Sequence, residues 1–197
     1  MRNLLGFSVF FLIAFLSINK VFAISPDVFV QSTVNRASEI LSKDFSKEEK
    51  MIQLKKIAKE TVDIRGVGFY SLGPIRKTLN KKQLNIYSDL FEKYFLKSFA
   101  SRLAEYTNPE IEVKDKEILN KNYTIVKSIL ISTSERPEIK IDWRVFTKDP
   151  DNPLIRDLII EGLSLARTQK EEFSSILNTN ENDINSLFKV LEEFYKN

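Results

Sequence analysis

Hydrophobic positions recur at helical spacing through residues 80–106 and predict one long amphipathic helix. Asn80 stands where an N-cap belongs, and Gln83 follows three residues later, as in a capping box. The helix has two apolar stripes that face different ways, the first Leu84, Tyr87, Phe91, Tyr94 and Phe95, the second Leu96, Phe99, Leu103 and Tyr106. We therefore expect it to bend or to contact two neighbours. Ordinary core and the wall of an apolar cavity both fit this pattern.

Other segments show shorter helical patterns. A first helix is predicted from Ser25 as N-cap to about residue 41, and a second from a capping box formed by Ser46 and Glu49. A third, over residues 63–72, carries two glycines that allow another backbone to approach closely. Two more helices are predicted near the end, at 167–177 and 183–195. The last is expected to turn Leu187, Leu191 and Phe194 inward.

Between residues 111 and 161 the period changes from helix to strand. Strands are predicted at 111–119, 123–133, 139–145 and 154–161, and the third shows clear alternation of apolar and polar residues. The fourth is almost wholly apolar, so we expect it to be central and covered on both faces. Short turns indicate an antiparallel meander. The predicted class is α+β, one sheet covered by helices on one side.

The chain begins with a segment typical of a secretory signal peptide. Arg2 precedes an apolar run of 15 residues, too short for the ~20 that span a bilayer, and Val21 and Ala23 fit a cleavage site. We expect cleavage after Ala23, leaving residues 24–197 as a single domain. An uncleaved anchor is the alternative.

Composition limits the chemistry. The chain has no cysteine and no histidine, so disulfides, thiolates and imidazole ligands are excluded and no metal site is expected. Residues 24–197 carry 28 basic and 27 acidic side chains, a net charge of +1, which argues against nucleic acid as the partner. Basic residues do gather around Arg76, Lys77, Lys81 and Lys82, either as a solvated helix entrance or as a docking patch for an acidic partner.

Three stretches together resemble the MlaC family of periplasmic phospholipid-binding proteins, also described as a toluene-tolerance family. The first joins Asp63-Ile64, Leu72-Gly73, Lys77-Thr78-Leu79 and Gln83, ahead of the aromatic helix. The second runs from Asp157 to Leu165 as DLIIEGLSL and is followed by Phe173. Between them, Arg136-Pro137 leads into the strand IDWR at 141–144. Their order and spacing cover nearly all of residues 25–197.

This resemblance implies a cone similar to NTF2, in which a curved antiparallel sheet of four or more strands and helices enclose an apolar pocket. It implies a monomeric periplasmic carrier with a phospholipid as cargo and no cofactor. The expected partners are an inner-membrane ABC transporter complex with an MCE-type subunit and an outer-membrane lipoprotein complex, and the role is to maintain outer-membrane lipid asymmetry.

The candidate residues for the lipid cavity are apolar side chains of the predicted helices and strands. They are Phe69, Leu72, Phe91, Tyr94, Phe95, Ile129, Ile131, Ile141, Trp143, Ile160 and Leu163. For each of them, plain core is the alternative.

Three acids, Asp63, Asp157 and Glu161, are predicted to be structural, as caps or as partners of Arg65 or Arg144. Two other functions stay open. One is an enzyme of the isomerase or dehydratase type, using Asp142 or Asp157 with Tyr123. The other is a structural adaptor with a solid core and no ligand.

Overall fold

The computed structural model describes residues 24–134 and 136–196, so the predicted signal peptide lies outside the described residues. Four helices come before the sheet, with one short 3-10 helix among them. They are α1 (Pro26–Ser42), α2 (Lys47–Thr61), α3 (Ile64–Ser71), η1 (Gly73–Lys77) and α4 (Lys81–Leu103). The strands are β1 (Ile111–Asn120), β2 (Tyr123–Leu130), β3 (Ile139–Phe146), β4 (Leu154–Ile160) and β5 (Leu163–Ser164). Two further helices, α5 (Leu165–Thr179) and α6 (Ile184–Lys196), complete the described chain. The predicted α+β class is confirmed.

The helix starts follow local sequence signals. Both predicted capping boxes form, that of α2 between Ser46 and Glu49 and that of α4 between Asn80 and Gln83. The prediction for α1 is only partly right, because the Ser25 side chain makes no cap hydrogen bond and instead donates to Asp27. Among the described residues, no helix is long and apolar enough to cross a bilayer.

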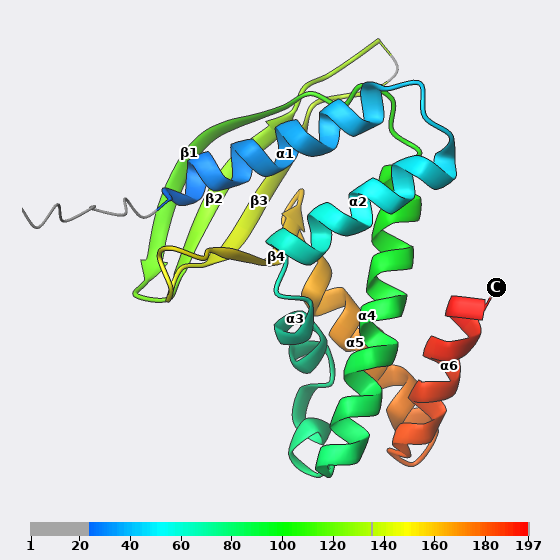
Figure 1. The fold of residues 1–197 in the computed structure, drawn as a ribbon. Helices are drawn as coiled ribbons and strands as arrows, with labels where there is room; N and C mark the ends of the chain where they lie inside the picture. Colours follow the sequence, from blue (N-terminus) through cyan, green and yellow to red (C-terminus); the bar gives the residue numbers. More distant parts are fainter. Residues whose placement is uncertain (1–23, 135, 197) are drawn as a thin grey trace, which may run out of the picture.

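The five strands form one antiparallel sheet in the order β1-β2-β3-β4-β5 (Figure 1). The expectation that residues 154–161 form a central strand is wrong. β4 lies one strand from the edge, and only β5, whose two residues are too few to show a strand pattern, lies beyond it. The apolar run of β4 reflects contact with α3 and α5 near the edge rather than a place in the middle of the sheet.

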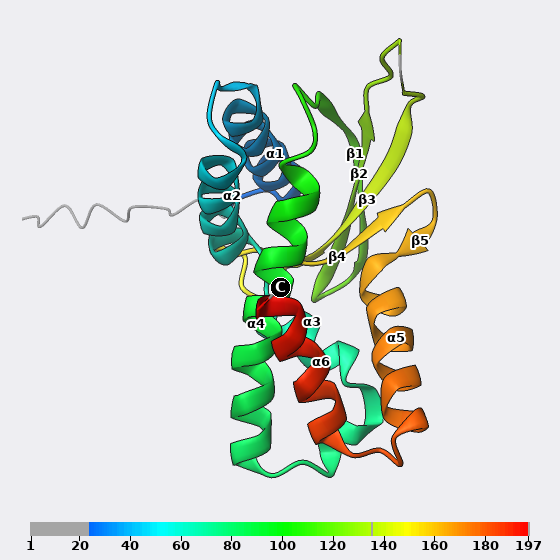
Figure 2. The ribbon, with the colours of Figure 1, turned by 90° about the vertical axis from the view of Figure 1, so that its right-hand side faces the viewer.

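Helices cover one face of the sheet and extend past its end. α1 packs across β1 and β2, and α2 lies between α1 and α4. Below the sheet, α3, α4, α5 and α6 pack on one another, and Figure 2 shows the C-terminal half of α4 rising between the α1–α2 layer and the sheet.

Most buried apolar side chains fall into two groups. The helical cluster comprises Ala58, Ile64, Val67, Leu72, Tyr87, Phe91, Leu96, Ala166, Phe173, Leu177, Ile184, Leu187, Phe188 and Leu191. The sheet cluster comprises Val30, Val34, Val126, Leu130, Ile141, Trp143, Val145 and Ile155.

The inward positions of α6 are only partly as expected. Leu187 and Leu191 are fully buried, but Phe194 is 40% exposed, so its predicted inward orientation is wrong. Phe194 lies in the last turn of the helix, where its ring packs on Tyr94 with 4.8 Å between centroids and the Lys97 ammonium lies 5.6 Å from the ring centroid.

Candidate functional site

An aromatic column runs along α4. The rings of Tyr87, Phe91, Phe95 and Phe99 follow at every fourth residue, with neighbouring centroids 5.7, 6.1 and 5.7 Å apart. Tyr87 and Phe91 are at most 1% exposed, whereas Phe95 and Phe99 are half-buried. The column therefore starts inside the helical cluster and ends with rings that keep free surface on the part of α4 nearest the sheet.

The buried end of the column is fixed by close contacts. The Tyr87 hydroxyl donates a hydrogen bond to the Gly68 carbonyl at 2.9 Å, and burial raises the pKa of this hydroxyl above its usual value. A Cβ at Gly68 would lie 2.6 Å from Cδ1 of Phe91, so the glycine allows α3 to approach the ring. Phe173 meets Tyr87 and Phe91 edge-on at 6.5 and 6.1 Å.

Apolar side chains also form a row across the inner face of the sheet, the face that α1 covers. Ile141 pairs with Ile160 between β3 and β4, and Ile160 pairs with Leu163 between β4 and β5. Directly paired residues lie on the same face of a sheet. Exposure rises along this row from 8% at Ile141 through the half-buried Ile160 to 59% at Leu163. The row is thus closed at β3 and open at the sheet edge.

Trp143 lies beside this row and is held by hydrogen bonds. Its Nε1–H donates to the Ser128 hydroxyl at 2.8 Å, and that hydroxyl donates to the Ile141 carbonyl at 2.9 Å. All three groups are buried, so the indole satisfies its only donor inside the sheet cluster. The ring orientation is fixed by these bonds and by its packing.

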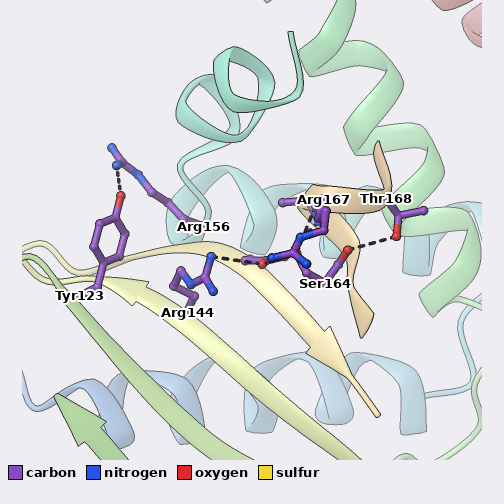
Figure 3. A network of polar contacts seen from close by, with 8 residues as sticks. Tyr123, Arg144, Arg156, Ser164, Arg167 and Thr168 are labelled. Carbon is purple, nitrogen blue, oxygen red and sulfur yellow. Dashed lines mark hydrogen bonds and ion pairs between the residues drawn. The ribbon is translucent and has the colours of Figure 1, made fainter. Parts of the chain in front are cut away.

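The two clusters meet where α2 passes into α3. Val62 packs against both clusters, and the next residue, Asp63, donates its backbone N–H to the Ile155 carbonyl at 2.9 Å. Arg156 donates to Asp63 at 2.7 Å and to the Tyr123 hydroxyl at 2.6 Å, and Figure 3 shows its guanidinium turned toward Tyr123. A polar clamp thus ties the start of α3 to the sheet.

A second polar group positions α5. Asp157, on β4 and 6% exposed, accepts hydrogen bonds from the Ser164 hydroxyl at 2.6 Å and the Ala166 N–H at 2.9 Å. Arg144 lies 3.6 Å from the same carboxylate, and Figure 3 shows Arg144, Ser164 and the first turn of α5 together. The predicted structural role of Asp157 is confirmed.

The other two acids predicted to be structural, Asp63 and Glu161, also accept hydrogen bonds from backbone N–H groups. Asp63 caps α3 by accepting from the Gly66 N–H at 2.8 Å, but it pairs with Arg156 and not with Arg65. Glu161 accepts the Lys140 N–H at 2.5 Å.

The structure does not assemble the proposed enzyme pair. The Tyr123 hydroxyl is bound by Arg156, while Asp157 is bound at the start of α5. Asp142 pairs with Ile159 on the outer face of the sheet, because its neighbours Ile141 and Trp143 point inward.

The predicted lipid-site residues fall into separate places. Five belong to or pack against the helical cluster, namely Phe69, Leu72, Phe91, Tyr94 and Phe95. Ile141 and Trp143 belong to the sheet cluster, and Ile160 and Leu163 continue its inner face to the edge. Ile129 pairs with Lys140 on the outer face, so the structure does not bring it to the others, and Ile131 lies just past the end of β2.

Three side chains that the candidate set omitted contribute to these surfaces. Phe99 continues the aromatic column, Phe173 closes its buried end, and Val62 joins the clusters. The i,i+4 spacing from Phe95 to Phe99 was the sequence signal that could have identified Phe99. The role of Val62 depends on a contact with a strand more than ninety residues later, which no local pattern reports.

Two open hollows on the described residues are lined mainly by polar residues. One, of about 430 Å³, follows α1 from Val28 to Glu39, and the other, of about 770 Å³, lies between Tyr70 and α5. Neither is the apolar pocket that the resemblance implies, which for a two-chain lipid would need a volume at the top of the usual range, ~1,000 Å³. Within the described ranges, no group of three or more acidic side chains is arranged to hold a metal ion.

Comparison with known proteins identifies a family and similar solved structures. The family model described as MlaC protein matches residues 31–193. Among solved structures, the chain is similar to a phospholipid-binding protein from Ralstonia solanacearum determined in complex with a phospholipid. The two share 19% sequence identity, with a TM-score of 0.74 over 88% of this chain and 98% of that one. At this identity the likeness shows a shared fold.

Proposed function

Because this chain belongs to the MlaC family, we propose that it is a periplasmic phospholipid carrier. The observation that carries the proposal is the pair of apolar surfaces described above. The half-buried rings of Phe95 and Phe99 lie on the part of α4 that rises beside the sheet, and the row from Ile141 to Leu163 lies on the inner face of that sheet. The similar Ralstonia protein, which binds a phospholipid, supports the assignment.

In this proposal, acyl chains enter between the aromatic column and the sheet row. α4 packs extensively on α2, α3 and α6, whereas the strands are held mainly by one another and by α1, α3 and α5. No strand is among the elements on which α4 packs closely, so parting α4 from the sheet leaves the strand ladders intact. Each methylene removed from water contributes ~0.8 kcal/mol, and a two-chain lipid has on the order of thirty, so a filled carrier does not release its cargo into water.

The proposed role is transport between membranes. The carrier takes or delivers its cargo at an inner-membrane ABC transporter complex with an MCE-type subunit and at an outer-membrane lipoprotein complex, and so maintains outer-membrane lipid asymmetry. The family assignment supports this role, and so does a first segment typical of a signal peptide. It acts as a monomer without a cofactor.

Mass spectrometry of the protein purified from its host periplasm tests the proposal. A native spectrum should show the mature chain together with a mass of one or more phospholipids, which organic extraction then identifies. A protein that carries no lipid, and takes none up from vesicles, would support the structural adaptor. Turnover of a small substrate by lipid-free protein would support the enzyme.

A further inference from the structure

Four basic side chains on α3, η1 and α5 form a surface that we call the basic patch: Arg65, Arg76, Arg167 and Lys170. The guanidinium carbons of Arg65 and Arg76 lie 5.1 and 5.8 Å from the centroid of the Phe69 ring. The Lys170 ammonium lies 5.4 Å from the centroid of the Tyr70 ring. Cation–π contacts of this kind hold the charges close to the protein surface.

The members of the patch are contiguous in space. α3 packs directly against α5 (Figure 1), and the Lys170 side chain lies beside Gly73, the first residue of the η1 helix that carries Arg76. Tyr70, Arg167 and Lys170 line the same shallow hollow. The patch therefore extends without interruption from α3 and η1 onto α5.

The charge of the patch is not neutralised by the protein. Among the described residues, the ion pairs between side chains include none of these four. The hollow contributes one acidic side chain, Glu171, which leaves four positive charges against one negative, a net +3. Residues 24–197 as a whole carry only +1, so the rest of this chain is net negative.

Exposed apolar side chains adjoin these charges. Tyr70 is 45% exposed within the patch, and Leu163 and Leu165, which are 59% and 39% exposed, come just before Arg167 in the chain. Unpaired cations beside exposed Tyr and Leu side chains are suited to the interface of an anionic bilayer, where the cations meet phosphate groups and the apolar side chains enter the head-group region.

We propose that the basic patch docks this protein on an anionic phospholipid membrane surface. Docking there brings the end of the sheet row marked by Leu163 near the bilayer. This consequence for loading rests on the proposed carrier function, whereas the docking itself does not.

The test is flotation of the mature chain with vesicles of mixed phosphatidylglycerol and phosphatidylcholine, compared with vesicles of pure phosphatidylcholine. The test variant combines Arg76→Gln, Arg167→Gln and Lys170→Gln. The control variant removes the same charge elsewhere, through Lys56→Gln, Lys121→Gln and Lys148→Gln, which are exposed positions on α2 and in loops of the sheet. Thermal melts of both variants establish that they fold.

We expect the wild type and the control to bind the anionic vesicles and the patch variant to bind them on the order of a hundredfold more weakly, since each Lys or Arg near an anionic leaflet contributes ~1 kcal/mol. Binding should weaken with added salt. Equal binding by both variants, or equal binding to pure phosphatidylcholine, would overturn the proposal. So would a patch variant that binds vesicles normally and fails only to bind an acidic partner protein.

The bound-lipid content of each protein is measured separately. Vesicle binding by a protein that holds no lipid would reject the carrier function and leave the docking surface standing. Lipid-loaded protein that does not bind vesicles would reject the docking surface and leave the carrier function standing.

Discussion

At the residue scale, Leu163 offers the sharpest test of the lipid site. We predict that Leu163→Glu retains the fold, with a stability change of about 0.5 kcal/mol or less, because this side chain is 59% exposed and a carboxylate there stays solvated. It should nevertheless abolish lipid retention, because the charge would lie in the row that we propose acyl chains cover. Lipid extraction and a thermal melt measure the two effects.

Ile118→Glu is the matched control for this variant. Ile118 is also on a strand and is 77% exposed, but it lies near the far end of β1. Its variant should keep wild-type lipid content. Equal lipid in the Leu163→Glu protein would mean that cargo does not contact the edge of the sheet.

The contact between Gly68 and Phe91 gives a prediction about stability. Gly68→Ala should lower the free energy of unfolding by about 1–3 kcal/mol, because the added Cβ overlaps a ring that other aromatic rings hold in place. The better helix propensity of alanine offsets part of this cost. Denaturant melts should show that Phe91→Leu, which makes room, reduces the penalty of the alanine. An additive double variant would contradict the steric explanation.

At the element scale, the attachment of α5 to the sheet depends on Asp157. We predict that Asp157→Ala lowers the free energy of unfolding by about 2–4 kcal/mol, because the buried Ala166 N–H loses its acceptor and Arg144 loses its counter-ion. Chemical denaturation measures this loss. Asp151→Ala, an exposed change in the loop before β4, should stay within about 0.5 kcal/mol of wild type.

The start of α1 should respond to acid. Hydrogen bonds from Lys116 and then Ser25 lower the pKa of Asp27 from 3.8 to about 2, and Lys116 joins the helix to β1 at 2.7 Å. A carboxyl whose pKa is depressed in the folded state stabilises the fold above its unfolded pKa and stops doing so as the pH falls through the folded value. We therefore expect this contribution to be lost between pH ~4 and ~2.

Stability measured against pH in that window checks this expectation. In Asp27→Asn, the free energy of unfolding should fall less steeply as the pH is lowered through this window. Lys116→Met, which removes the partner of Asp27, should have a similar effect. A wild-type slope in both variants would show that the contact contributes nothing to folding.

Sequence patterns located the helices well because their signals are local. The capping boxes that begin at Ser46 and Asn80 each lie within a few positions and formed as predicted. The same holds for the strand predicted from the alternation of residues 139–145. The place of β4 could not be derived this way, because its apolar side chains contact α3 and α5, whose approach depends on the whole fold. The two-residue β5 is too short to have a period.

The candidate site shows the same limit. Ile129 and Ile141 are both apolar strand residues, yet the register of β2 against β3 places them on opposite faces. Register is a non-local property, seen here in the pairing of Ile129 with Lys140 and of Ser128 with Ile141. The aromatic column, by contrast, follows directly from i,i+4 spacing on α4.

At the scale of the whole molecule, bound cargo should stabilise the fold. A ligand that binds the folded state and not the unfolded one raises the free energy of unfolding according to its concentration and affinity. We predict that delipidated protein melts at a lower temperature than protein purified with its lipid, and that adding phospholipid restores the difference. Identical melts would argue for a solid-core adaptor.

Maturation is a separate prediction. We expect the exported protein to begin at Ile24, because Val21 and Ala23 fit a cleavage site after a short apolar run. The intact mass of the periplasmic form decides between this product and a chain that keeps residues 1–23 in the membrane fraction.

The hydrogen-bonded indole of Trp143 gives this protein an internal optical probe. It is the only tryptophan of the chain, it is 8% exposed, and it lies beside the sheet row that we assign to the cargo. Its fluorescence therefore reports one position without any label. Acyl chains carrying bromine should quench that emission on loading, and the depth of the brominated carbon that quenches most strongly would show how far along the chain the cargo is held.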